Sequence, residues 1–188
     1  RFLRRHKDEP AVPGVDDGDM VVDSLEDLTW RLRALAGLRN TVGMKIVTIG
    51  GASGWATPKA PELAREKFKL EMQNITYPEL KTLLVAARED AAAVKLARER
   101  AERYLRGGGV TLETEKSFVE NCFLLDHVFR GLMEKAGARA ITVNSCMGTI
   151  MPVAETTACL TLSTLNDAGF QAYCESDFVV IPSGMLLA

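Results

Sequence analysis

The sequence of 188 residues lacks the marks of several classes of protein. No apolar run approaches the ~18 residues of a membrane-spanning helix. No stretch near Arg1 combines an apolar region with the small residues of a secretory cleavage site. The net charge is −2, so the protein as a whole has no positive field that would favour nucleic acid or an anionic membrane. We therefore expect neither nucleic acid nor a membrane among the partners of this protein.

Motifs for zinc binding and thiol redox chemistry are also missing. The chain has two histidines and four cysteines, at positions 122, 146, 159 and 174. The cysteines have neither the close spacing of a zinc site nor a C-x-x-C pattern. Each of them lies among apolar residues, which predicts buried, reduced thiols and a cytoplasmic location.

The composition is that of a globular protein, because 47% of the residues are hydrophobic. A chain of this length can bury a core without disulfides or metals. The first residue is not Met, and the last five, GMLLA, are apolar and carry no stop signal. We therefore expect a fragment of a multi-domain protein. Residues 1–23 mix charges with Pro and Gly, which predicts a linker or the tail of a preceding domain.

Predicted strands and helices alternate along the rest of the chain. Apolar, β-branched runs predict strands at 45–49, 70–77, 139–146 and 170–175. Helical spacing predicts helices at 24–38, 61–68, 78–90, 91–105, 111–138 and 155–169, with another at the end. This order predicts an α/β domain, doubly wound and Rossmann-like, with a mainly parallel sheet and helices on both faces. It spans residues 24–188 and is truncated at its C-terminus.

The ends of three predicted strands carry unusual residues, and ligands bind beyond such ends in open α/β sheets. After the first strand, GGASGW does not fit the dinucleotide pattern G-x-G-x-x-G, and no Walker A motif is present. The two glycines, Gly50 and Gly51, favour a tight turn instead.

After the third strand comes NSCMGTIMP. A cysteine nucleophile needs a nearby base, but His127, next to Asp126 in the long helix, is predicted to be solvated. We expect Ser145, Cys146 and Met147 to contact a substrate through the backbone, with simple packing as the alternative.

The fourth strand ends on an acid, Glu175. A carboxylate at this place can bind a hard divalent cation, or move a proton if its pKa is shifted. The alternative is an exposed surface acid. Asp177, two residues on, is predicted to be the N-cap of the last helix.

Two motifs near the end of the chain follow one another in a recognisable order. ACLTLSTLNDAG at 158–169 is a Cys-Leu-bearing helix that ends in Leu-Asn-Asp-x-Gly, and CESD at 174–177 ends the next strand. Together they resemble the middle domain of the L-fucose isomerase-like family. The resemblance is specific over 140–188, more diffuse from Met44 onward, and absent before Ser24. Pro182 departs from the family's pattern and predicts a helix start near this residue.

The resemblance implies an aldose–ketose isomerase that acts on a free sugar by enediol proton transfer. It implies a divalent metal, usually Mn²⁺, at the junction of two Rossmann-like domains and a β-rich domain, and it implies a homo-oligomer. Glu175 is then a metal ligand and one of two acid–base carboxylates. The second acid and a histidine ligand lie further along the family's chain, so we expect the fragment alone to be inactive. The alternative is a non-catalytic α/β domain that binds a sugar or another subunit.

Overall fold

The structure, a computed structural model, describes residues 24–188. The predicted linker or tail, residues 1–23, lies outside the described residues. The internal contacts of the chain divide it into two units, residues 1–39 and residues 40–188, and each is described by itself.

Of the first unit, residues 24–39 are described, and they comprise Ser24 and most of helix α1 (Leu25–Thr41). The backbone N–H of Asp27 donates to the Ser24 hydroxyl at 3.1 Å, so Ser24 caps the helix. Four leucines of this helix at helical spacing are all exposed: Leu25, Leu28, Leu32 and Leu35.

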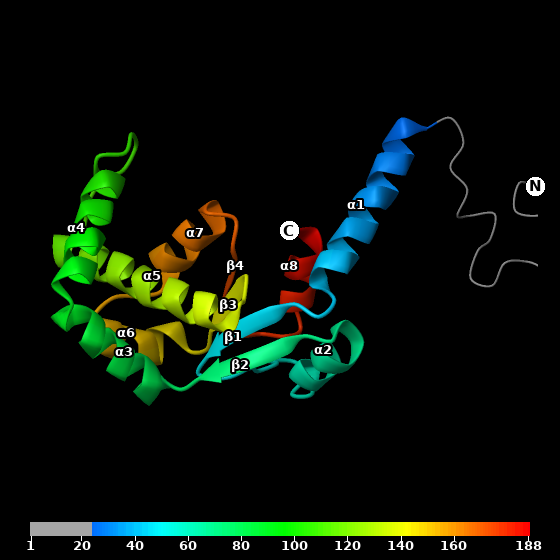
Figure 1. Cartoon of the computed structure of the whole chain (residues 1–188), viewed down its shortest axis with the longest axis horizontal. Coiled ribbons are helices and arrows are strands. Elements are labelled where there is room, and N and C mark those ends of the chain that lie inside the picture. Colours follow the sequence, from blue (N-terminus) through cyan, green and yellow to red (C-terminus); the bar gives the residue numbers. More distant parts are fainter. Residues whose placement is uncertain (1–23) are drawn as a thin grey trace, which may run out of the picture. The chain divides into compact units, whose positions relative to one another are not determined.

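The second unit is built on a sheet of four parallel strands in the order β2-β1-β3-β4 (Figure 1). The strands are β1 (Lys45–Ile49), β2 (Glu71–Ile75), β3 (Ala140–Val143) and β4 (Gln171–Cys174). Every connection between neighbouring strands is a crossover that contains at least one helix, as parallel pairing requires. The predicted doubly wound α/β fold is therefore confirmed.

Five helices lie on one side of this sheet. They are α3 (Tyr77–Glu89), α4 (Ala91–Leu105), α5 (Lys116–Ala136), α6 (Met151–Ala154) and α7 (Cys159–Asp167). Val47 and Ile141 of the central strands pack with Leu80, Phe129 and Leu165 of these helices, and all five are fully buried. This is the larger of the two cores, and burial of its apolar surface is the main force that holds the helices to the sheet.

The other face of the sheet is covered by α2 (Ala60–Phe68) and α8 (Ile181–Leu187). Ile46 and Ala140 point to this side and pack with Ala64, Ile181 and Met185. Ile46 and Val47, neighbours in β1, enter different cores because successive side chains of a strand alternate between faces. Pro182 lies in the first turn of α8, as expected.

Two observed strands, β2 and β3, end earlier than the sequence predicted. The strand predicted at 70–77 ends at Ile75, because Thr76 caps α3 in a capping box with Glu79. The strand predicted at 139–146 stops at Val143. Residues 146–154 then form a π-helical turn, η2 (Cys146–Ile150), and α6, neither of which was expected.

No helix among residues 24–188 combines the length and the apolar character that crossing a bilayer requires.

A buried carboxylate links three of the helices. Asp126 of α5 is fully buried, and its Oδ2 accepts hydrogen bonds from Arg100 of α4 and, at 2.8 Å, from Arg130 of α5. Thr164 of α7 donates to its other oxygen at 3.5 Å. The buried charge is thus compensated by two guanidinium groups, each of which keeps part of its surface in water.

We predict that Asp126→Ala lowers the free energy of unfolding by about 3 kcal/mol, which is the lower end of the range for breaking a buried pair. The lower end applies because Arg100 and Arg130 remain partly hydrated once the carboxylate is gone. Urea unfolding followed by circular dichroism measures the change. Glu134→Ala, an exposed acid on the same helix, is the control, and we expect it to stay within about 0.5 kcal/mol of the wild type. Equal stabilities for the two variants would contradict this account.

Candidate ligand site at the carboxyl edge of the sheet

The loops that follow the strands meet at one edge of the sheet. Ile49 is paired with Ile75 and with Val143, and Val143 is paired with Cys174, so the four parallel strands end at nearly the same level. In open parallel sheets this edge is where ligands bind. The residues that follow each strand are therefore the first candidates for a functional site.

The loop after β1 is bonded to the turn after β4. The Ser53 N–H donates to the Ser176 carbonyl at 3.0 Å, and the Phe178 N–H donates to the Ser53 carbonyl at 2.9 Å. The Ser53 hydroxyl also donates to the Ser176 carbonyl, at 3.2 Å. Because β3 lies between β1 and β4, this loop passes the carboxyl end of β3 on its way. One edge of the sheet is thus closed by contacts between segments about 120 residues apart.

The turn after β4 has an uncommon backbone conformation. Glu175 and Ser176 are both left-handed, with φ of 66° and 47°, a region that non-glycine residues rarely adopt. The turn is held by the Ser176 N–H, which donates to the buried Thr142 hydroxyl at 3.1 Å. This conformation ends β4 at Cys174 and leaves Glu175 partly exposed at the edge.

Hydrogen bonds and close packing also connect the ends of β1, β2 and β3, through Gly50, Tyr77 and Asn144. The Tyr77 hydroxyl donates to the Asn144 carbonyl, and the Asn144 side-chain amide donates to the Gly50 carbonyl at 3.4 Å. Gly50 has φ of 77°, and a Cβ there would lie 2.3 Å from the Tyr77 oxygen. The turn after β1 therefore needs glycine at this position, in agreement with the tight turn expected from the sequence.

Ser145, Cys146 and Met147 form the exit from β3. Ser145 is exposed and left-handed, with φ of 52°, and Met147 is 61% exposed. Cys146 instead points into the core, where its sulfur accepts a hydrogen bond from the Ala158 N–H at 3.2 Å. The structure thus brings this predicted substrate-binding segment to the same edge as Glu175, with the cysteine side chain turned inward.

Three groups that carry protons surround the Glu175 carboxylate. Burial raises the pKa values of Tyr77, Cys146 and Cys174, and the negative charge of Glu175 raises each of them further. The pKa of Cys174 is raised to about 11 by burial first, and then by Cys146 and Glu175, and its thiol donates to Glu175 Oε1 at 3.6 Å. At neutral pH all three groups keep their protons. The Glu175 carboxylate is therefore a hydrogen-bond acceptor with weak hydrogen-bond donors near it.

Tyr77 was not among the residues expected at the site. It was assigned to the end of the second strand, and the rule that singled out the ends of the other strands applies to it equally. Ser53 and Thr142 gave no local signal, because their roles depend on partners from distant segments.

Two sequence predictions about this region are wrong. Asp177 is not the N-cap of α8, which begins at Ile181. Its carboxylate accepts from the N–H groups of Val179 at 3.1 Å and Trp55 at 3.3 Å, so it ties the turn after β4 to the loop after β1.

The prediction of four buried thiols holds for only two of them. Cys122 and Cys146 are buried, whereas Cys159 and Cys174 are exposed. Cys174 lies at the end of an edge strand, and Cys159 lies at the start of α7, so neither is covered on all sides. His127 is exposed, as expected.

The described residues do not by themselves form a manganese site. Within residues 24–188, no three His, Cys, Asp or Glu side chains are grouped so that they could hold a metal ion. Two backbone amides donate to one oxygen of Asp177, Oδ1, so this carboxylate already holds the turn after β4, and Glu175 is the candidate ligand at this edge. Mn²⁺ takes about six oxygen or nitrogen ligands, so one carboxylate is too few.

Comparisons with known proteins do not assign a family. No protein-family model matches the chain, and a search of curated proteins found no match either. The likeness to L-fucose isomerase-like proteins therefore rests on the motifs at 158–169 and 174–177.

The closeness of Cys174 and Glu175 can be tested by thiol reactivity. The thiolate is the reactive species, so a pKa of about 11 should slow alkylation of the exposed Cys174 at pH 8. We predict a rate on the order of a hundredfold below that of an unstructured cysteine peptide. Glu175→Gln removes one of the causes of the raised pKa and should speed the reaction. Mass spectrometry of iodoacetamide-treated protein measures the rate at each cysteine.

Glu71→Gln is the matched control, because Glu71 lies at the opposite end of β2. It should leave the rate at Cys174 unchanged. Alkylation of wild-type Cys174 at the peptide rate would contradict the raised pKa of this thiol, of which burial is the first cause. Equal rates in the two glutamate variants would show that Glu175 does not lie where the structure places it.

Proposed function

We propose that this chain is the middle α/β domain of a metal-dependent aldose–ketose isomerase that acts on a free sugar. The proposal assigns Glu175 as an acid–base carboxylate and as one ligand of a divalent metal, with Mn²⁺ as the expected ion. Ser145, Cys146 and Met147 are proposed to line the substrate site, with the backbone and the exposed side chains as the contacting groups.

The position of Glu175 carries the proposal. The carboxylate stands partly exposed at the carboxyl end of a parallel strand, in a left-handed turn held by hydrogen bonds to Ser53 and Thr142. A fixed carboxylate is what proton transfer to and from carbon requires, since the base must be held within hydrogen-bond reach of the proton it removes.

The reaction needs one proton to leave carbon and another to return. In the proposed step Glu175 removes the proton from the carbon next to the sugar carbonyl, the electron pair forms the double bond of the enediol, and the carbonyl oxygen gains a proton. A proton then returns to the former carbonyl carbon while the hydroxyl on the neighbouring carbon loses its proton and becomes the new carbonyl, so the aldose becomes the ketose with no net gain or loss of protons. Tyr77 and Cys174 hold their protons at neutral pH, so they act as hydrogen-bond donors near the carboxylate rather than as competing bases.

The rest of the site comes, in this proposal, from residues outside the described set. Glu175 supplies one carboxylate, whereas the reaction type calls for a second acid–base group and the metal calls for further ligands. Another segment of the same protein or another subunit meets this requirement if it closes over the carboxyl edge. The homo-oligomer that the resemblance implies is compatible with either source.

We predict that the complete protein carrying this chain interconverts an aldose and a ketose when Mn²⁺ is present. Glu175→Gln should lower kcat by about 10²-fold or more, because the neutral amide cannot accept a proton. Polarimetry or chromatography of the sugar pool measures turnover over a panel of aldoses. Glu71→Gln keeps the same change of charge at the amino end of β2 and should retain full activity.

Circular dichroism of both variants separates a loss of catalysis from a loss of fold. Undiminished turnover by a folded Glu175→Gln protein would remove the proposed role of this residue. Sugar binding without turnover, insensitive both to a chelator and to Glu175→Gln, would instead favour a non-catalytic sugar-binding domain.

A further inference from the structure

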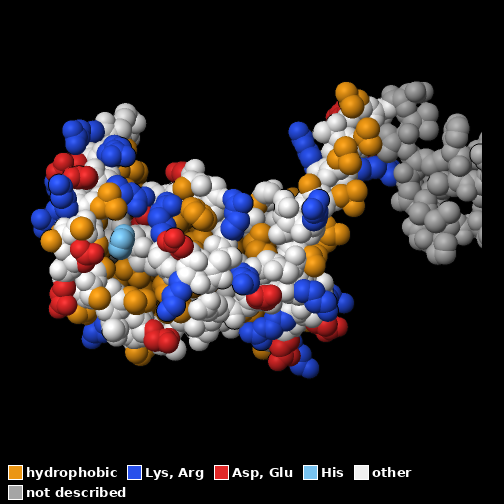
Figure 2. Space-filling view, in the orientation of Figure 1, with side chains coloured by type: hydrophobic (Ala, Val, Ile, Leu, Met, Phe, Trp, Pro, Cys, Tyr) orange, Lys and Arg blue, Asp and Glu red, His pale blue; other side chains and the backbone are white. Residues whose placement is uncertain are grey.

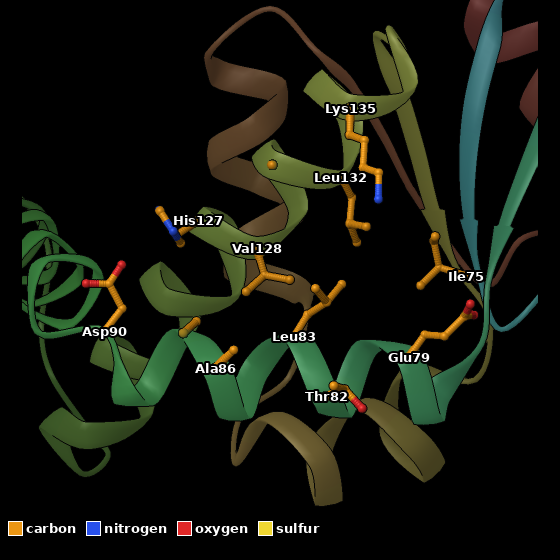
Figure 3. Close-up of a pocket in the computed structure, with 12 residues that line it drawn as sticks. Ile75, Glu79, Thr82, Leu83, Ala86, Asp90, His127, Val128, Leu132 and Lys135 are labelled. Atoms are coloured by element: carbon orange, nitrogen blue, oxygen red, sulfur yellow. The ribbon is translucent and has the colours of Figure 1, made fainter.

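An apolar groove runs between α3 and α5, away from the carboxyl-edge site. Its volume is about 590 Å³, and its lining is mostly apolar, with Leu83 and Ala86 from α3 facing Val128 and Leu132 from α5 (Figure 3). Leu83 is 39% exposed, so a bulky apolar side chain stands in water at the rim. Such a surface is stabilised when another apolar surface covers it.

One residue that lines the groove, Gly131, is a glycine although the fold of the single chain leaves room for a side chain there. Gly131 lies in the interior of α5, where glycine is less favourable than alanine. A Cβ at this position would meet no atom within 4 Å, so no neighbour within the chain excludes a side chain. A missing side chain at an exposed helix surface permits close approach by a second backbone.

Each end of the groove carries one acidic and one basic side chain. Figure 3 shows Glu79 of α3 and Lys135 of α5 toward one end, and Asp90 and His127 toward the other. At each end an acid lies on the α3 side and a basic side chain lies on the α5 side. Hydrogen bonds from Thr76 lower the pKa of Glu79, so this acid is ionised at neutral pH.

The charges of this groove are complementary to those of the same groove in a second copy when one particular two-fold axis relates the two copies. A two-fold axis along the groove sets α3 of one copy over α5 of the other and keeps each residue at its own end. Glu79 then meets the other copy's Lys135, and Asp90 meets the other copy's His127. A two-fold axis across the groove sets α3 over α3 with its ends reversed, so Glu79 meets Asp90 and like charges face each other.

We propose that the groove between α3 and α5 is a self-association surface, and that its occupant is the same groove of a second copy. The two copies form an antiparallel four-helix arrangement with Leu83 buried at the centre and Gly131 at the closest approach of the helices. This proposal is independent of the role assigned to Glu175, because neither Glu175 nor the segment from Ser145 to Met147 lines the groove.

The size of the surface sets the expected strength. Helix α3 has 13 residues and is about 20 Å long, and two adjacent helices are about 20 Å wide. A patch of these dimensions is at the small end of specific protein interfaces, where complexes are weak. We therefore expect a dimer with a dissociation constant in the micromolar range.

Sedimentation equilibrium of the chain of residues 1–188 tests the proposal directly. Loading from about 1 to about 200 µM brackets a micromolar dissociation constant, and the average mass should rise toward twice that of one chain. Gly131→Met fills the space at the closest approach with a good helix former, and it should leave a monomer over the whole range. Its thermal unfolding midpoint at low concentration should not fall below that of the wild type.

A charge exchange tests the proposed pairing. Lys135→Glu places an acid opposite Glu79 of the other copy and should raise the dissociation constant at least tenfold. Adding Glu79→Gln removes that repulsion, keeps the capping group of α3, and should recover part of the loss. Lys81→Glu, on an exposed part of α3 outside the groove, makes the same change of charge and should have no effect.

A wild-type chain that remains monomeric at the highest concentration overturns the proposal and leaves the groove to a different occupant. A dimer that persists in Gly131→Met with the wild-type dissociation constant places the interface elsewhere on the chain. Loss of affinity in Lys135→Glu that Glu79→Gln does not relieve rejects the two-fold axis along the groove.

Discussion

Two backbone hydrogen bonds at Ser53 hold the candidate site in place. They join the loop after β1 to the turn after β4, although β3 separates these strands in the sheet. The Asp177 carboxylate strengthens the same junction by accepting from the Trp55 N–H. Without this junction, the bond from the Ser176 N–H to Thr142 would be left to hold Glu175 at the end of an edge strand, in a left-handed conformation that non-glycine residues seldom keep. The position of the Glu175 carboxylate therefore depends on the hydrogen bonds between the loop after β1 and the turn after β4.

The rest of the fold supplies a rigid base for this edge. The central strands are covered on both faces by separate apolar cores, and their residues have almost no contact with water. On one face, Asp126 ties α4 and α5 together through two arginines. Helix α3 joins the two regions for which we propose functions, since Tyr77 at its start belongs to the carboxyl edge and Leu83 in its middle lines the groove. Figure 1 shows α3 beside α5, and Figure 2 shows hydrophobic side chains among charged ones on the surface of this part of the molecule. A partner in the groove would thus bind a helix that also supports the site.

Local sequence signals predicted most of the fold. The strand at Lys45–Ile49 was predicted at its observed ends because a β-branched run meets two glycines, and α4 was predicted because a charged helical pattern runs up to three glycines. The turn and short helix at 146–154 were missed because that segment combines Gly, Pro and no helical period. The sequence pointed to the edge of the sheet and to Glu175, but not to the bonds that hold the edge together. The partners of Ser53, Thr142 and Asp177 come from distant segments, and single-sequence patterns do not record such contacts.

Hydrogen exchange at the amide of Ser176 tests most directly whether the turn that carries Glu175 is fixed. This amide donates to the buried Thr142 hydroxyl, and Thr142→Val removes the acceptor while keeping the shape of the side chain. The account predicts slow exchange at Ser176 in the wild type, and exchange about fivefold faster in the variant, since the opening free energy falls by about 1 kcal/mol, the contribution of one hydrogen bond. Amides of α4 should not change. Fast exchange at Ser176 in the wild type would contradict the account, because the turn would then be free and Glu175 would have no fixed place at the edge of the sheet.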